Sequence, residues 1–206
     1  MTDDQRETVL VPGGRDVRAT LDEPEGETDA CVVACPPHPQ MGGRRTDRRL
    51  RAVSDALSER GVACLRFDYG PWAEGEGERT DARNALGWTR ERYGTVGVFG
   101  YSFGGAVALL AAAAGSEDGT PPAATSVLAP AARLEAGLDA AAAVGAIDRP
   151  LQAVYGERDT TADWEPVVER ARESGAEVVE VSADHHFVGQ DAKVGGLVGE
   201  FLAARL

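Results

Sequence analysis

The sequence is poor in the residues from which disulfides, metal sites and membrane spans are built. Its three cysteines, Cys31, Cys35 and Cys64, all lie in apolar runs and cannot all pair, which indicates buried thiols in a reduced compartment. No second cysteine pair or histidine cluster completes a zinc set, so no metal is expected. No apolar run approaches the roughly 18 residues that span a bilayer. The polar start, residues 1–5, is unlike a secretory signal, so we expect a cytoplasmic protein outside the membrane.

Lysine is almost absent, because Lys193 is the only lysine among 21 basic residues. With 34 acidic residues the formal net charge is −13, and a chain this acidic repels nucleic acid and anionic membrane surfaces. Neither is therefore expected as a partner. The composition is similar to that of proteins from salt-accumulating organisms, in which salt screens the repulsion between carboxylates. This charge pattern predicts a halophilic habitat and says nothing about a substrate.

Strand-like and helix-like segments alternate along the whole chain, which predicts one α/β domain over residues 1–206. A mostly parallel twisted sheet of about seven or eight strands, flanked by helices, is expected. Strands are expected at 7–11, 15–21, 30–35, 62–67, 95–99, 125–129, 151–155 and 177–181, the first two forming a hairpin. Helices are expected at 46–60, 79–92, 105–114, 163–174 and 191–206, with one short helix's worth of chain in 131–146.

Residues 100–104 read Gly-Tyr-Ser-Phe-Gly, between an apolar strand and an alanine-rich helix. This is the G-x-S-x-G pattern in the strand–turn–helix context that its chemistry requires. On so tight a turn Ser102 is expected to have a strained backbone and an exposed hydroxyl, while the glycines remove Cβ atoms that would collide. The amide of Phe103 would then face the carbonyl that Ser102 attacks. The pattern predicts a nucleophile, and the alternative is a tightly packed turn without chemistry.

A serine needs a positioned base, and histidine is the natural choice because its pKa lies near neutrality. The chain has only three histidines, of which His185 and His186 directly follow the last expected strand. Since adjacent residues cannot both face Ser102, one of these two is the expected base. His38, which follows the strand at 30–35, is expected to shape its loop.

The base in turn needs an acid, and Asp159 follows the strand that precedes the histidine strand. The rivals of Asp159 are Glu157, Asp163 and Asp184. The order Ser, Asp, His, each at the carboxyl end of a strand, is that of the α/β-hydrolases. Parallel strands would bring all three to one edge of the sheet.

With these residues the chain resembles the α/β-hydrolase superfamily over essentially its whole length. The chain most resembles a small prokaryotic branch with a Pro-His-Pro loop after the first central strand. The matching residues are Pro37, His38 and Pro39 with Gly42 and Gly43, then 65–68, 100–105, and Ala183, Asp184 and His185 with Phe187. The resemblance favours His185 over His186, which stands where the branch has a phenylalanine. The chain also departs from the pattern of this branch in the loop 68–77, where the branch reads Arg-Gly-x-Gly-x-Ser.

The loop after strand 30–35 normally supplies a second amide for the oxyanion in this superfamily. Because Pro39 has no N–H, we expect the amide of Gln40, or less readily that of Met41, to join that of Phe103. The alternative is a proline-stiffened loop without a catalytic amide. The residues expected to line the pocket are His38, Met41, Tyr69, Trp72, Tyr101 and His186. The arginines at 44, 45, 48, 49 and 51 resemble an anion site, but in so acidic a chain they are expected to pair with surface carboxylates, Arg48 with Asp55 by helical spacing.

The sequence therefore predicts a serine hydrolase that cleaves a small ester or thioester through an acyl-serine, without a cofactor. Residues 130–149 leave room for a minimal lid at most, so a shallow, open pocket is expected. One alternative is a catalytically silent protein of the same fold that binds a small ligand or a partner. Another is a peptidase or acyltransferase with the same triad. The oligomeric state stays open between monomer and homodimer.

Overall fold

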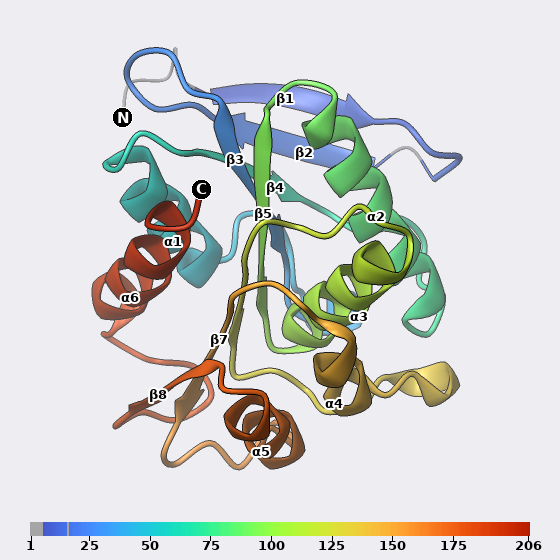
Figure 1. Ribbon diagram of the computed structural model, residues 1–206, viewed down its shortest axis with the longest axis vertical. Coiled ribbons are helices and arrows are strands. Elements are labelled where there is room, and N and C mark those ends of the chain that lie inside the picture. The colour runs from blue at the N-terminus through green and yellow to red at the C-terminus, as the bar shows by residue number, and fades with distance from the viewer. Residues whose placement is uncertain (1–5, 16) are drawn as a thin grey trace.

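A twisted sheet of eight strands forms the centre of the computed structural model, which describes residues 6–15 and 17–206 (Figure 1). The strands are β1 (Arg6–Val11), β2 (Val17–Asp22), β3 (Ala30–Cys35), β4 (Ala63–Phe67), β5 (Thr95–Tyr101), β6 (Thr125–Leu128), β7 (Leu151–Gly156) and β8 (Glu177–Val181). Their order across the sheet is β1-β2-β4-β3-β5-β6-β7-β8. Strand β2 is antiparallel to both of its neighbours, β1 and β4, whereas the pairings among β3 to β8 are all parallel. The expected, mostly parallel sheet is thereby confirmed.

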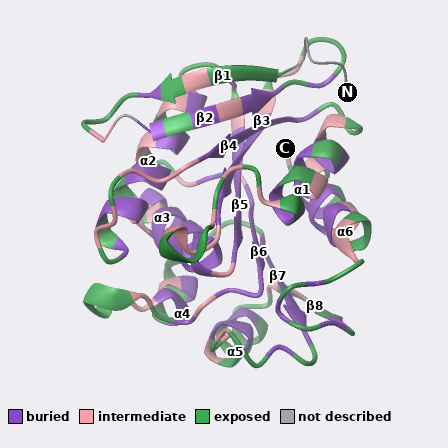
Figure 2. Cartoon of the chain, turned by 180° about the vertical axis from the view of Figure 1, so that it is seen from behind, coloured by how far each residue is buried: buried purple, intermediate pink, exposed green. Residues whose placement is uncertain are grey.

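Helices cover both faces of this sheet (Figures 1 and 2). They are α1 (Arg48–Ser58), α2 (Glu76–Arg90), α3 (Phe103–Glu117), α4 (Ala140–Ala143), α5 (Glu165–Glu173) and α6 (Asp191–Ala203), with 3₁₀ turns η2 (Pro39–Met41), η3 (Glu135–Gly137) and η4 (Val144–Ala146). The pair α1 and α6 packs on one face, and α2, α3, α4 and α5 pack on the other. Within residues 6–15 and 17–206, no helix combines the length and apolar character that crossing a bilayer requires.

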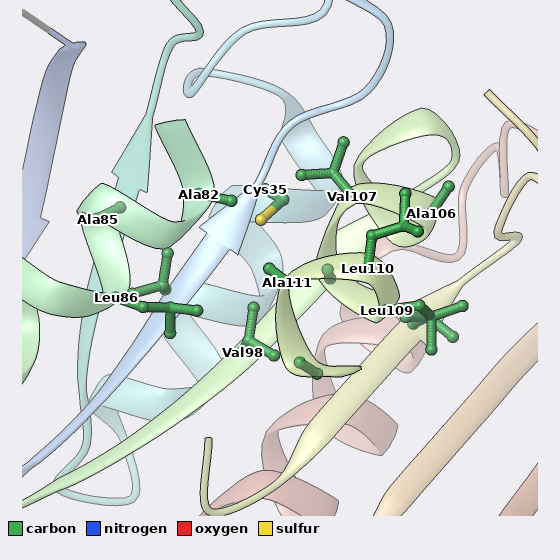
Figure 3. Packing of buried hydrophobic residues seen from close by; sticks show 14 of the residues in the cluster. Cys35, Ala82, Ala85, Leu86, Val98, Ala106, Val107, Leu109, Leu110 and Ala111 are labelled. Atoms are coloured by element: carbon green, nitrogen blue, oxygen red, sulfur yellow. The ribbon is translucent and has the colours of Figure 1, made fainter. Parts of the chain in front are cut away.

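The apolar run of the central strand β3 is continuous because both faces of the strand are buried. Cys31, Val33 and Cys35 belong to the core under α2 and α3, whereas Val32 and Ala34 belong to the core under α1 and α6. Because side chains alternate along a strand, a strand covered on both faces favours apolar residues at successive positions. The small side chains of α3 let this helix pack closely on β3 and β5 (Figure 3).

Local hydrogen bonds explain where the helices begin. Helix α1 begins two residues later than predicted, because the carboxylate of Asp47 accepts the Arg49 amide and caps the helix. Helix α2 begins inside the predicted loop 68–77, because the buried Glu78 carboxylate accepts the amides of Ala73 and Gly75. The polar start 1–5 and residue 16 of the predicted second strand lie outside the described residues.

Candidate active site

Ser102 occupies the turn between the central strand β5 and helix α3. Its backbone has φ 57° and ψ −120°, a conformation that L-residues avoid and that costs about 1–3 kcal/mol. The turn is held in place because the Ser102 amide donates to the Leu128 carbonyl at 2.8 Å and the Ser102 carbonyl accepts the Gly105 amide at 2.8 Å. The strained turn predicted from the sequence is present.

The two glycines around Ser102 are required by close approach of backbone to backbone. A Cβ on Gly100 would overlap the carbonyl of Gly104, and a Cβ on Gly104 would overlap the carbonyls of Cys35 and Pro36. The first turn of α3 therefore lies directly against the end of β3. This contact brings the amide end of α3 beside the loop 36–43.

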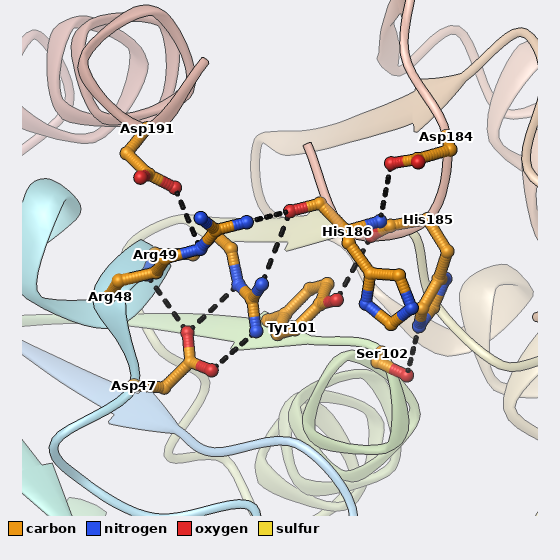
Figure 4. A network of polar contacts seen from close by, with 9 residues as sticks. All are labelled: Asp47, Arg48, Arg49, Tyr101, Ser102, Asp184, His185, His186 and Asp191. Carbon is orange, nitrogen blue, oxygen red and sulfur yellow. Dashed lines mark hydrogen bonds and ion pairs between the residues drawn. The ribbon is translucent and has the colours of Figure 1, made fainter. Parts of the chain in front are cut away.

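A continuous chain of hydrogen bonds joins Ser102, His185 and Asp159. The Ser102 Oγ lies 3.0 Å from Nε2 of His185, and Nδ1 of His185 lies 2.7 Å from Oδ2 of Asp159. Figure 4 shows His185 directed at Ser102. His185 follows β8 and Asp159 follows β7, so the three side chains meet at the carboxyl edge of the parallel strands.

The carboxylate of Asp159 is held for this contact by its own loop. Its second oxygen, Oδ1, accepts the amides of Thr161 at 2.9 Å and Ala162 at 3.1 Å. The indole of Trp164 also donates to the Asp159 carbonyl at 3.0 Å. With Oδ1 engaged in this way, Oδ2 is directed at the imidazole.

The rival residues do not enter this chain of hydrogen bonds. His186 is exposed, and its amide donates to Oδ1 of Asp184 at 2.9 Å. Glu157 lies at the surface, 3.8 Å from Arg158, and Asp163 is exposed at the pocket wall. The structure thus brings together Ser102, Asp159 and His185.

The loop after β3 differs from its prediction. The amide of Gln40 donates to Nδ1 of His38 at 3.3 Å, and Gln40 does not line the cavity. The amides of residues 41–43 donate to carbonyls of the same loop at 3.0–3.2 Å. The Gln40 and Met41 amides are therefore engaged elsewhere. The prolines at 36, 37 and 39 have no N–H, so among the described residues of this loop only the His38 N–H is left without an acceptor.

A cavity of about 490 Å³ opens above Ser102. One wall is aromatic, with the His38 ring centroid 4.7 Å from that of Trp72 and 4.8 Å from that of Phe103. The remaining wall is formed by Pro37, Met41, Gly42, Gly43, Asp47, Arg49, Tyr101, 131–135, 161–163, His185 and His186. Unlike the other predicted pocket residues, Tyr69 does not line the cavity but packs behind Phe103 and donates to the Pro36 carbonyl at 3.1 Å.

Tyr101 lies under the reacting groups. It is buried, and its hydroxyl donates to the His185 carbonyl at 2.9 Å. Burial raises the pKa of Tyr101 to about 12, so the hydroxyl stays protonated and remains a donor at ordinary pH.

Two charged residues of the cavity wall are not predicted as such from the sequence, which gives no role to Asp47 and expects Arg49 to pair with a surface carboxylate. Both lie where α1 begins, and their arrangement depends on tertiary contacts. The predicted pairing of Arg48 with Asp55 is wrong, because Arg48 lies 3.4 Å from Asp191 of α6. In the part of the chain that the structure describes, no cluster of histidine, cysteine, aspartate or glutamate has the arrangement of a metal site.

Comparison with solved structures finds the same architecture in proteins described as α/β serine hydrolases. The chain is similar to an α/β serine hydrolase homologue from Coxiella burnetii, with a TM-score of 0.80, 24% identity and 98% of each chain covered. It is also similar to a lidless α/β serine hydrolase from Xanthomonas campestris, with a TM-score of 0.77, 20% identity, and 100% of this chain and 97% of the other covered. For Est1E from Butyrivibrio proteoclasticus the TM-score is 0.83, with 18% identity and 98% of each chain covered.

No family model matches the sequence, and no curated protein matches it significantly. The structural likeness nevertheless extends over almost the entire chain. The chain therefore has the α/β-hydrolase fold, in a form without a lid.

Proposed function

We propose that this protein is a serine hydrolase that cleaves small carboxylic esters or thioesters through an acyl-Ser102 intermediate. The observation that carries the proposal is the hydrogen-bonded chain from Ser102 Oγ through His185 to Asp159, at 3.0 and 2.7 Å. A serine hydroxyl becomes a useful nucleophile when a neutral imidazole accepts its proton and a carboxylate orients that imidazole.

In the first half of the reaction Ser102 Oγ attacks the ester carbonyl carbon and its proton passes to Nε2 of His185. The carbonyl π electrons move onto oxygen, which gives a tetrahedral oxyanion. Collapse of this intermediate breaks the bond to the leaving alcohol or thiol, which takes the proton from His185. In the second half water repeats the attack on the acyl-serine, and the carboxylic acid leaves. The carboxylate of Asp159 accepts the Nδ1–H of His185 throughout and so keeps the imidazole oriented.

The oxyanion is stabilised by two backbone amides, those of Phe103 and His38. The Phe103 amide is at the first turn of α3, where helical N–H groups lack intrahelical acceptors. The His38 amide replaces the predicted Gln40 amide, because His38 supplies the unengaged N–H of its loop among the described residues. Each such donor contributes about 3 kcal/mol of transition-state stabilisation in other serine hydrolases.

The cavity supports a compact substrate. A volume of about 490 Å³ accommodates a small ester, and of residues 130–149, which form the short elements η3, α4 and η4, only 131–135 line the cavity. The aromatic wall of His38, Trp72 and Phe103 suits a short aliphatic or an aromatic acyl group. Est1E has been crystallised with ferulic acid bound, which is an acid with an aromatic ring. The proposed substrate is therefore a small molecule.

A fluorophosphonate probe tests the proposal, because it forms a covalent bond only with an activated serine. The protein is treated with the probe at high and at low salt, since its acidic composition predicts salt adaptation. Mass spectrometry should then find the adduct on Ser102, and Ser102→Ala should lose both the label and the hydrolysis of p-nitrophenyl acetate.

The same experiment separates the alternatives. A folded protein that is not labelled in either salt would be a silent ligand-binding protein of the same fold. Labelling without hydrolysis of any ester, but with cleavage of peptides or transfer of acyl groups to an added alcohol, would indicate a peptidase or an acyltransferase.

A further inference from the structure

Arg49 is buried beside the proposed catalytic histidine, although it lies in a run of arginines that looks like a solvated helix start. Its residue is only 9% exposed, and each of its three guanidinium nitrogens donates a hydrogen bond. Nε donates to Oδ1 of Asp47 at 2.9 Å and Nη2 to Oδ2 at 2.5 Å, which is a bidentate pair. Nη1 donates to the carbonyl of His186 at 3.1 Å, and the guanidinium carbon lies 4.3 Å from the ring centre of Tyr101.

These contacts place Arg49 between three segments that form the site (Figure 4). Asp47 caps α1 immediately after the loop that carries the His38 amide. Tyr101 directly precedes Ser102, and its hydroxyl donates to the His185 carbonyl at 2.9 Å. We call the group formed by Asp47, Arg49, Tyr101 and the carbonyls of His185 and His186 the arginine clamp.

The backbone held by this clamp is strained. Phe187 follows His186 with φ 50°, and its side chain is fully buried. A non-glycine residue in this region costs about 1–2 kcal/mol unless surrounding contacts impose it. The carbonyl of His186 accepts both Arg49 and Arg48, the latter at 2.9 Å, and charged donors make strong hydrogen bonds. These bonds oppose relaxation of the turn at the residue that follows the proposed base.

From this arrangement we propose that Arg49 is a positioning residue that fixes the backbone of the His185 loop, so that Nε2 of His185 stays aligned with Ser102. This inference rests on the proposed serine hydrolase function and adds a residue to it. Arg49 acts through Tyr101 and the His186 carbonyl. Loss of the clamp should therefore lower kcat more than it changes KM, because a small misplacement of a catalytic group costs rate.

The test compares Arg49→Met with Arg51→Met on the same helix, since Arg51 is exposed and lies outside the clamp. With p-nitrophenyl acetate we expect Arg49→Met to lower kcat by about 10- to 100-fold. Arg51→Met should leave kcat near the wild-type value. The far-downfield proton NMR signal of the His185 Nδ1–H should broaden or shift in Arg49→Met and stay in place in Arg51→Met.

Two further variants keep the proposal falsifiable if Arg49→Met does not fold. Arg49→Lys retains the charge but cannot reach Asp47 and His186 with a bidentate fork, so a smaller loss of kcat is expected. Tyr101→Phe removes only the hydroxyl under His185 and should lower kcat in the same direction.

Folded Arg49 variants with wild-type kcat and an unchanged His185 signal would overturn the proposal and leave Arg49 a stabilising residue only. Failure of the proposed function would be distinguishable, because the wild-type protein itself would then hydrolyse no ester and take no fluorophosphonate label.

Discussion

The two sides of the cavity above Ser102 are built differently. On the reacting side, Asp159 and His185 are buried, and their polar atoms are engaged at the ends of strands. On the outer side, Met41 is 81% exposed and the Arg133 side chain is 75% exposed, in short loops whose hydrogen bonds are mostly local. The fold thus fixes the residues of the proposed triad, whereas the selection of a substrate is expected to depend on exposed loops.

Replacing each of the two neighbouring histidines should give the largest difference in kcat between the two sides of the cavity. His185→Ala removes the proposed base and should lower kcat by about 10⁴-fold or more, as loss of a triad member does. His186→Ala removes an exposed ring on the cavity rim and should change kcat only slightly. Steady-state hydrolysis of p-nitrophenyl acetate by both variants measures the difference. Similar losses in the two variants would mean that the reacting side does not depend on the buried His185 alone.

A second test compares a glycine beside Ser102 with an exposed glycine of the turn η4, through stability rather than rate. Gly104→Ala places a Cβ against the carbonyls of Cys35 and Pro36, so the free energy of unfolding should fall by about 3 kcal/mol. Gly145→Ala, in η4, meets nothing within 4 Å and has no left-handed φ, so it should be neutral or stabilise by about 0.5 kcal/mol. Urea denaturation of both variants gives these values. A tolerated Gly104→Ala would show that α3 and β3 can separate at no cost.

The same contrast explains what could be predicted from the sequence. The strand at 95–101, the turn at Ser102 and the order of Asp159 and His185 carry local signals, namely apolar runs, glycines at fixed offsets and strand ends. The free amide of the loop 36–43 has no such local signal in the sequence. Its identity depends on which carbonyls the loop turns inward, and the His38 carbonyl accepts two of the loop's own amides.

Arg49 could not be recognised for a related reason. Helical spacing predicts partners on the same helix, but Arg48 and Arg49 reach the His186 carbonyl and Asp191, more than 130 residues further along the chain. A run of arginines at a helix start has the same pattern whether its members face solvent or the site. Only the packing of α1 on α6 and β5 distinguishes the two cases.

Tyr101, beneath the reacting side, gives a pH-dependent test of intermediate size. Its pKa is about 12 in the folded protein and about 10 in an unfolded chain. Its protonated hydroxyl therefore contributes stability that is fully present below about pH 10 and is lost as the pH rises to about 12, because the unfolded state releases the proton first. The loss amounts to about 3 kcal/mol at most.

Unfolding free energies of the wild-type protein and Tyr101→Phe between pH 9 and 12 measure this contribution. The variant lacks the hydrogen bond to His185 and should start about 1 kcal/mol less stable. It should then lose less stability than the wild-type protein as the pH rises. Parallel curves would show that Tyr101 is not protected from deprotonation by its burial.

The smallest expected effect lies on the substrate side, at Trp72. Its ring lies against His38 and lines the cavity, in the loop 68–77 that departs from the pattern of the resembling branch. Trp72→Ala should enlarge the acyl site and raise kcat/KM for p-nitrophenyl octanoate relative to the acetate by about 10-fold, because pocket contacts with a few methylenes are worth only about 1–3 kcal/mol. The label on Ser102 should form as in the wild-type protein, since no hydrogen bond joins Trp72 to the described residues of the reacting chain. If kcat/KM for the octanoate relative to the acetate does not change, the size of the acyl group is limited instead by the other exposed wall, residues 131–135.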